Sequence, residues 1–137
     1  APKRQKPSRR GLVFVAINQD GEAFLERRPD QGLLGGMVAF PSVGWTQTDW
    51  SDADVHAAYS AAPFAAAWRK LPEPVHHVFT HFALEMIIYY AETDGPVVAA
   101  NNGWWQVPEL SQLPSLMRKV WKQVETSKHL QARPKKP

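Results

Sequence analysis

The sequence predicts an α+β domain in which one mixed β-sheet packs against helices, the last of them amphipathic. Three features lead to this fold class. Two apolar runs near the N-terminus flank an Asp-Gly turn, a dense apolar run covers residues 83–91, and apolar residues recur with helical spacing over residues 113–124. At 137 residues, the chain is long enough for one domain with its own core.

The first part of the chain is predicted to form a hairpin followed by a third strand. Residues 12–17 and 23–27 are short apolar runs typical of buried strands. An Asp-Gly pair at residues 20–21 supplies the positive φ that a tight turn between them needs. Residues 37–40 form another apolar run, which Pro41 ends because proline has no N–H to donate to a sheet.

A glycine-rich turn and a short helix are expected next. The stretch 32–36 carries three glycines around two leucines, but it lacks the GxxxxGK[ST] and GxGxxG spacings of phosphate-binding loops. It is therefore typical of a tight turn anchored by its leucines. Ser51 with Asp54 three residues later resembles a capping box, so we expect a helix over residues 52–62, ended by Pro63.

The second half of the chain contains the central strand of the predicted sheet. Residues 75–79 and 82–91 are expected to form strands, and residues 104–107 one more. Alternation along 82–91 places Leu84, Met86, Ile88 and Tyr90 on one face and Ile87, Tyr89 and Ala91 on the other. Because both faces are apolar, this strand should be covered on both sides.

The C-terminal helix is the clearest element of the sequence. Apolar residues follow the i, i+3, i+4, i+7, i+8, i+11 spacing of a helix with one buried face: Leu113, Leu116, Met117, Val120, Trp121 and Val124. Pro114 lies near the first turn, where proline is tolerated. The polar face carries three bases, Arg118, Lys119 and Lys122.

Composition excludes several classes of site. The chain has no cysteine, so it can form neither a disulfide nor a thiolate metal site, and it has no thiol nucleophile. No stretch approaches the roughly 20 apolar residues of a membrane-spanning helix, and the N-terminal residues lack the apolar core of a signal peptide. We expect a cytoplasmic protein with no membrane partner.

Positive charge is concentrated at the two ends. Residues 1–10 carry five bases and no acid, residues 118–137 carry seven bases and one acid, and residues 11–117 carry four bases and twelve acids. Basic ends on an acidic body suggest contact with a polyanion, although they could also be solvated linkers. We expect residues 1–10 to be a basic interdomain linker and residues 126–137 a basic, disordered tail. The candidates for contact with a DNA backbone are Arg9, Arg10, Arg118, Lys119 and Lys122.

A polar cluster interrupts the apolar run of residues 75–92. It comprises His76, His77, Thr80 and His81. Adjacent strand residues point to opposite faces, so at most two of the histidines could share a metal ion, and we expect no metal site. The rings could be satisfied by backbone groups. Alternatively, the cluster could recognise a planar ligand such as a base, with Phe79 as a flat apolar surface and the Thr80 hydroxyl as both donor and acceptor.

Three separated stretches resemble the C-terminal domain of the MutY-type A/G-specific adenine DNA glycosylases. They are RRPDQGLLGGMVAFP from residue 27, HHVFTHFALEM from residue 76 and WWQVPELSQLPSLMRKVWKQ from residue 104, and the Asp-Gly hairpin precedes them in the expected order. The resemblance covers residues 9–123. It implies a Nudix-like domain over residues 11–125 that recognises 8-oxoguanine opposite a misincorporated adenine.

The resemblance assigns lesion recognition to a short loop. In that family a Phe-Ser-His tripeptide contacts the oxidised base, and the matching residues are Phe79, Thr80 and His81. Threonine keeps the hydroxyl but adds a methyl group and stiffens χ1. His76 and His77 are expected to support this loop. Another departure, Val38-Ala39 where the family often has a pair such as Trp-Glu, is interpreted as variation in the core.

The resemblance also implies that this chain alone is not an enzyme. In the family, a separate N-terminal domain holds the helix-hairpin-helix module, the catalytic carboxylates and a 4Fe–4S cluster, which a chain without cysteine cannot bind. The intact protein would be an adenine DNA glycosylase of base excision repair, associated with the nucleoid. It would hydrolyse the N-glycosidic bond of the adenine in duplex DNA with an A:8-oxoguanine mismatch. We expect no cofactor in this chain.

A Nudix hydrolase is the nearest alternative enzyme. Such enzymes hold Mg²⁺ near phosphate oxygens with several glutamates on one helix. No glutamate lies between Glu26 and Glu73 of this sequence, so the hydrolase chemistry is not expected. The remaining alternative is a catalytically inactive module of the same fold that binds a nucleotide or a protein.

Overall fold

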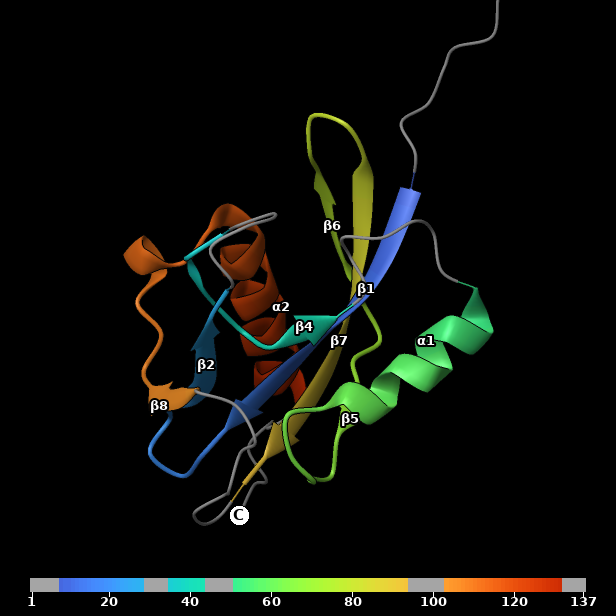
Figure 1. The fold of residues 1–137 in the computed structure, drawn as a ribbon. Helices are drawn as coiled ribbons and strands as arrows, with labels where there is room; N and C mark the ends of the chain where they lie inside the picture. Colours follow the sequence, from blue (N-terminus) through green and yellow to red (C-terminus); the bar gives the residue numbers. More distant parts are fainter. Residues whose placement is uncertain (1–7, 29–34, 44–50, 94–102, 132–137) are drawn as a thin grey trace, which may run out of the picture.

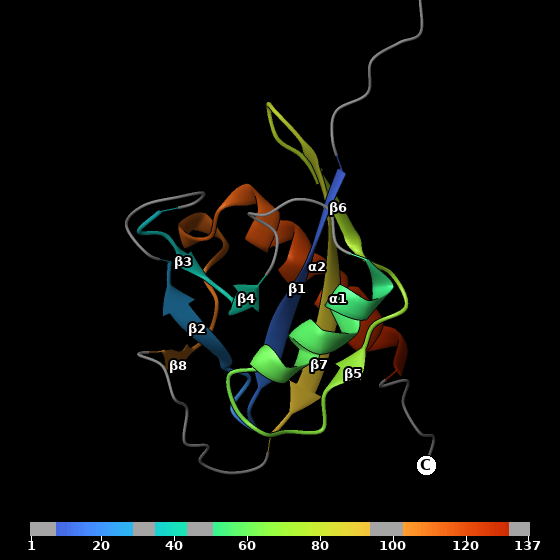
Figure 2. The ribbon, with the colours of Figure 1, turned by 45° about the vertical axis from the view of Figure 1, so that its right-hand side comes forward.

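One mixed sheet lies between two helices in the computed structural model, which describes residues 8–28, 35–43, 51–93 and 103–131 (Figures 1 and 2). Its elements are β1 (Ser8–Ile17), β2 (Ala23–Arg27), β3 (Val38–Ala39), β4 (Ser42–Val43), α1 (Asp52–Ala58), the 3₁₀ helix η1 (Tyr59–Ala61), β5 (Arg69–Lys70), β6 (Val75–Val78), β7 (Ala83–Glu92), β8 (Trp104–Gln106), the 3₁₀ helix η2 (Leu110–Gln112) and α2 (Ser115–Gln131). The predicted α+β fold with a C-terminal amphipathic helix is confirmed.

The centre of the sheet is the parallel pair of β1 and β7. Their register runs from Ser8 opposite Ala83 to Ile17 opposite Glu92. The strand order is β3-β2-β1-β7-β5, with β4 on β1, β6 on β7 and β8 on β2. β1 begins four residues before the predicted strand, so the sheet includes residues 8–10 of the expected linker. Their polar side chains carry no strand signal, and β7 supplies the backbone partner that makes them a strand.

β7 is covered on both faces, as its sequence predicts. Its even-numbered residues from Leu84 to Tyr90 join the main core cluster together with α2. Ile87 and Tyr89 pack on the other side with Leu12 and the end of α1. Parallel strands require such two-sided cover, since βαβ-type connections place other elements on both faces.

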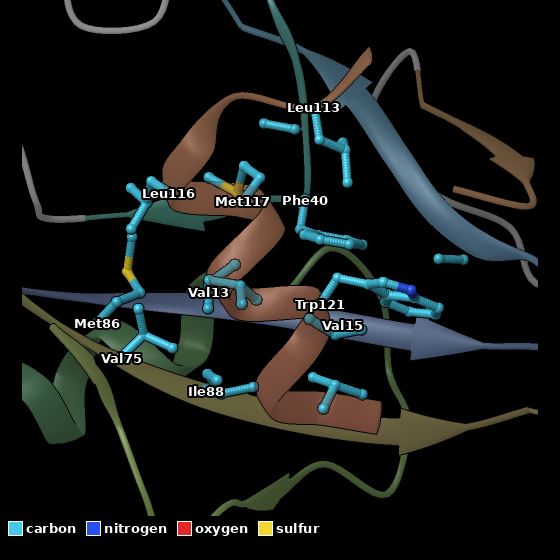
Figure 3. Packing of buried hydrophobic residues seen from close by; sticks show 14 of the residues in the cluster. Val13, Val15, Phe40, Val75, Met86, Ile88, Leu113, Leu116, Met117 and Trp121 are labelled. Carbon is cyan, nitrogen blue, oxygen red and sulfur yellow. The ribbon is translucent and has the colours of Figure 1, made fainter. Parts of the chain in front are cut away.

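α2 supplies most of the cover on one face of the sheet. Figure 3 shows Leu116, Met117 and Trp121 of α2 packed over Val13 and Val15 of β1. The helix continues to Gln131, beyond residue 125 where the domain was expected to end, so residues 126–131 of the expected tail are helical. Ser127 is buried, so the buried face of α2 extends one turn beyond Val124. The sequence pattern did not predict this turn, because serine is polar.

Aromatic rings complete the cover of the opposite face, where α1 spans only seven residues. Phe14 meets the Trp68 ring edge-on at 5.3 Å and lies 5.9 Å from Tyr89. Tyr59 in turn lies 5.0 Å from Tyr89. These rings pack with the end of α1 over this face of the sheet.

α1 begins with the predicted capping box. The Ser51 hydroxyl accepts from the Asp54 N–H, and the Asp54 carboxylate accepts from the Ser51 N–H. α1 ends at Ala58, and η1 follows it directly up to Ala61. The α-helix is therefore shorter than the predicted helix, which ended at residue 62. Ala62 is extended, with φ −54° and ψ 145°, because the residue before a proline avoids helical backbone.

Two short edge strands were not predicted. β4 pairs with β1 through Leu12 opposite Val43, and β5 pairs with β7 through Arg69 opposite Tyr90. The strand predicted over residues 37–40 is limited to β3, in which Ala39 is fully buried, in agreement with core variation at this position. Residues 32–34 of the glycine-rich stretch lie outside the described ranges. In the described ranges, no helix has the length and apolar character needed to cross a membrane.

Candidate nucleic-acid interface

A tight turn joins β6 to β7 and carries the three residues matched to lesion recognition. The Phe79 N–H donates to the Phe82 carbonyl at 2.8 Å, so Thr80 and His81 are the two central residues of the turn. Both of these side chains are exposed. In Figure 1 the turn projects beyond the helices at one end of the sheet. Two hydrogen-bonding side chains therefore lie at a protruding tip.

Phe79 belongs to a row of packed rings. Its ring lies 4.8 Å from that of Phe82, with 30° between the planes, and the His77 ring meets it edge-on at 4.7 Å. At the far end of the row, the guanidinium carbon of Arg9 lies 4.0 Å from the centroid of Phe82. Phe82 is buried and Phe79 is half-buried. The row thus supports Phe79 from within the protein and leaves part of its surface accessible.

The two adjacent histidines have different surroundings. His76 is exposed, whereas His77 is half-buried against Phe79. Among the described residues, the buried Nδ1 of His77 has no hydrogen-bond partner. Burial, and to a smaller extent the charge of Lys119, lowers the pKa of His77, so its neutral form is favoured. Of the two histidines expected to support the turn, His77 is the one that contacts it.

The histidines near the turn are not gathered into a group of ligand side chains in the described part of the chain. No group of three or more His, Asp or Glu side chains that could hold an ion occurs there. The alternation of β6 explains this result, since His76 and His77 point to opposite faces of the strand.

Arg118 is engaged within the protein. Its Nη1 donates to the carbonyls of Leu113 at 2.8 Å and Leu110 at 3.3 Å, and its Nη2 donates to the Ser115 hydroxyl at 3.0 Å. These carbonyls belong to the segment that leads from η2 into α2. The geometry therefore indicates a structural role for Arg118, although the sequence grouped it with the bases available to DNA.

Lys119 and Lys122 line a groove between α2 and β6. The groove has a volume of about 410 Å³, and its other lining residues are Pro74, Val75, His76, Gln123 and Thr126. Lys119 Nζ donates to the His76 carbonyl at 3.1 Å, which holds its ammonium at the edge of the groove. The groove thus presents two ammonium groups beside the strand that leads to the turn.

The two bases of β1 point to opposite faces of the sheet. Arg9 lies over Phe82, on the side of α2, whereas Arg10 bridges two carboxylates on the side of α1. Its Nη1 lies 3.0 Å from Asp52 Oδ1 and its Nε lies 3.5 Å from Glu85 Oε1.

Arg10 also lines a hollow of about 480 Å³ beside α1. The carboxylates that line it, Asp52 and Glu85, are both paired with Arg10. They therefore compensate an arginine instead of forming the cluster of acidic ligands that a divalent cation prefers.

Comparison with known proteins gives one family and a set of similar structures. A family model described as NUDIX domain matches residues 12–123. The C-terminal domain of mouse MUTYH, in a structure of its complex with human PCNA, is 20% identical with a TM-score of 0.64, and the match covers 93% of each chain. A MutT protein from Methanosarcina mazei Go1 is 16% identical with a TM-score of 0.63, covering 96% of this chain and 100% of the other.

Other similar structures are described as hydrolases. A MutT NUDIX hydrolase from Burkholderia pseudomallei is 18% identical with a TM-score of 0.59, covering 87% of this chain and 99% of the other. At these identities the similarities show a shared fold and do not distinguish a recognition domain from a hydrolase.

Proposed function

The chain belongs to the NUDIX domain family, and we propose that it is the domain of an adenine DNA glycosylase that reads 8-oxoguanine opposite adenine. Excision of the adenine would be carried out by an N-terminal domain with a 4Fe–4S cluster, and this chain would position that domain without taking part in bond cleavage. The ligand of this chain is then duplex DNA with an A:8-oxoguanine mismatch.

The observation that carries this proposal is the β6–β7 turn. It combines one supported aromatic ring, Phe79, with two exposed hydrogen-bonding side chains, Thr80 and His81, at a tip that projects from the sheet. A base needs both kinds of group, because its face stacks on a ring and its edge is read by hydrogen bonds.

The chemistry of the lesion suits these groups. Guanine presents only an acceptor at N7, whereas 8-oxoguanine has a donor at N7 and a carbonyl oxygen at C8. The Thr80 hydroxyl can accept from the new N–H or donate to the new oxygen. The hydroxyl could still donate to N7 of unmodified guanine, so the preference for the lesion comes from the added N–H and the added oxygen.

The groove between α2 and β6 supports a path for the DNA backbone. His76 lines the groove and Thr80 lies four residues further along the chain. At about 3.3 Å per strand residue the two are at most on the order of 13 Å apart, since β6 ends at Val78 and Thr80 lies in the turn. This is about four base-pair steps, so a duplex read at the turn could place a phosphate near Lys119 and Lys122.

A protein partner is a second candidate, supported by the mouse MUTYH domain in its complex with human PCNA. A hydrolase is disfavoured by the lack of glutamate between Glu26 and Glu73. An inactive module that binds a free nucleotide is the other alternative. It is distinguished from lesion recognition by comparing the affinity of the chain for the free oxidised nucleotide with its affinity for the duplex.

Thr80→Ala is expected to reduce the preference for an A:8-oxoguanine duplex over an A:G duplex by roughly ten-fold or less. A net hydrogen bond contributes about 0.5–1.5 kcal/mol, which sets this size. The measurement is NMR titration of the labelled chain with both duplexes, following the amides of the β6–β7 turn. Thr80→Ser, the matched control, keeps the hydroxyl and should be nearly neutral. Equal responses of the wild-type chain to the two duplexes would contradict the proposed function.

Lys122→Ala is expected to weaken binding to both duplexes about equally and to reduce the slope of log K against log salt concentration by roughly one. With one phosphate contact removed, binding releases about one counterion fewer, whatever the base sequence of the duplex. Arg118→Ala is the control, because its guanidinium already binds Leu113 and Ser115. Arg118→Ala should lower thermal stability and leave the slope unchanged. A slope that falls for Arg118→Ala but not for Lys122→Ala would place the phosphate path elsewhere.

A further inference from the structure

The start of β1 lies directly against the turn that carries the proposed recognition residues. Ser8, the first residue of β1, is opposite Ala83, the first residue of β7, and Arg9 is opposite Leu84. β7 begins immediately after Phe82. The chain therefore enters the sheet next to the turn, although about 70 residues of sequence separate the two segments.

The Arg9 side chain makes the connection between these segments. Its guanidinium carbon lies 4.0 Å from the centroid of the Phe82 ring, within the range of a cation–π interaction. Arg9 is half-buried and Phe82 is 5% exposed, so the ring is closed on one side by the guanidinium. An arginine suits this position because its planar guanidinium stacks on a ring face, which an ammonium group does less well.

The contact extends to the ring at the tip. Phe82 stacks on Phe79 at 4.8 Å, and Phe79 meets His77 at 4.7 Å. Arg9, Phe82, Phe79 and His77 thus form a continuous row that crosses β1, the turn and β6. Three of the four members are rings, and Arg9 is the only one that comes from outside the β6–β7 hairpin.

From this row we infer that Arg9 is a positioning residue for lesion recognition. It fixes the face of Phe82, and Phe82 fixes the plane of Phe79, so Arg9 sets the conformation of the turn without touching the base. The inference rests on the proposed function for its ligand. It assigns to Arg9 a role different from the DNA-backbone contact that its charge alone suggests.

The inference has a direct test in the free chain. Arg9→Ala should shift the ring resonances of Phe79 and Phe82 and the amide resonances of Thr80 and His81. Arg69→Ala removes an exposed arginine from β5, away from the turn, and is the control that should leave these resonances in place. Unchanged turn resonances in Arg9→Ala would overturn the inference, whether or not the chain binds DNA.

Binding measurements then distinguish a positioning role of Arg9 from a contact with a phosphate. Arg9→Ala should loosen the whole turn and so misplace the Thr80 hydroxyl, which lowers the preference for the A:8-oxoguanine duplex over the A:G duplex by about three- to ten-fold, with Arg9→Lys between wild type and alanine. The salt slope should stay the same. Equal weakening on both duplexes, with a slope lower by about one, would show that Arg9 contacts a phosphate and overturn the positioning role. A wild-type chain without preference would contradict the proposed function, and the resonances of the free chain would still decide whether Arg9 sets the turn.

Discussion

Trp121→Ala is expected to lower the free energy of unfolding by about 3–5 kcal/mol, because the substitution leaves a large cavity between α2 and the sheet. The Trp121 side chain is 8% exposed and stacks on Phe40 at 5.9 Å, with 19° between the planes. A domain of this size is stable by only about 5–15 kcal/mol, so the loss is a large fraction of its total stability. Urea denaturation followed by circular dichroism measures the loss.

Two controls make this expectation specific to packing. Lys122→Ala changes the next residue, which is exposed, and should alter stability by no more than about 0.5 kcal/mol. Trp121→Phe keeps a ring against Phe40 and should recover much of the loss. If Trp121→Ala costs less than about 1 kcal/mol, α2 does not dock on the sheet as the structure shows.

Elements with a strong internal pattern were predictable from the sequence. The apolar spacing from Leu113 to Val124 identifies the buried face of α2, and all six patterned residues are buried, although Leu113 itself precedes the helix. The apolar character of both faces of β7 likewise predicts cover on both sides, which α2 and the aromatic layer provide. In both cases the apolar residues of the element itself indicate which of its faces are buried.

Elements that depend on a partner were not predictable. Ser8, Arg9 and Arg10 have no strand pattern and become a strand because β7 offers a parallel partner. β4 and β5 have two residues each, too few for any period to appear. Pairing across a sheet depends on register between distant segments, and a single segment does not contain that information.

The same division holds for the candidate site. The residues of the turn, Phe79, Thr80 and His81, were proposed from the sequence because they resemble a family motif. The contact of Arg9 with Phe82 was missed, because it arises from the parallel register of β1 and β7. The different environments of Arg118 and Lys122 were missed as well, since three bases on one helical face look equivalent until their partners are known.

The fold itself does not decide between recognition and hydrolysis. Structures of a mouse MUTYH domain and of MutT proteins are about equally similar to this chain. The distinction therefore rests on side chains, which is general for folds that serve many functions. Here the relevant features are the lack of glutamate between Glu26 and Glu73 and the aromatic and polar side chains of the β6–β7 turn.

Phe79→Ala is expected to weaken binding of the A:8-oxoguanine and A:G duplexes alike, by roughly 5- to 150-fold. Stacking of a base on an aromatic ring contributes about 1–3 kcal/mol, and each 1.4 kcal/mol corresponds to about ten-fold in affinity. The faces of guanine and 8-oxoguanine are nearly the same, so the ratio of the two affinities should change little. This outcome is the opposite of that expected for Thr80→Ala, which changes the ratio more than the affinity for A:G.

Phe79 also packs on Phe82 and His77, so its loss could weaken binding by loosening the turn instead of removing a stacking surface. Phe79→Tyr and Phe79→Leu separate these causes in titrations with both duplexes. Tyrosine keeps the ring face and should bind almost as well as wild type, whereas leucine keeps apolar bulk without a π face and should stay weak. Full affinity in Phe79→Leu would show that bulk in the turn is sufficient. In that case the base does not stack on Phe79, and the lesion is read by the polar side chains alone.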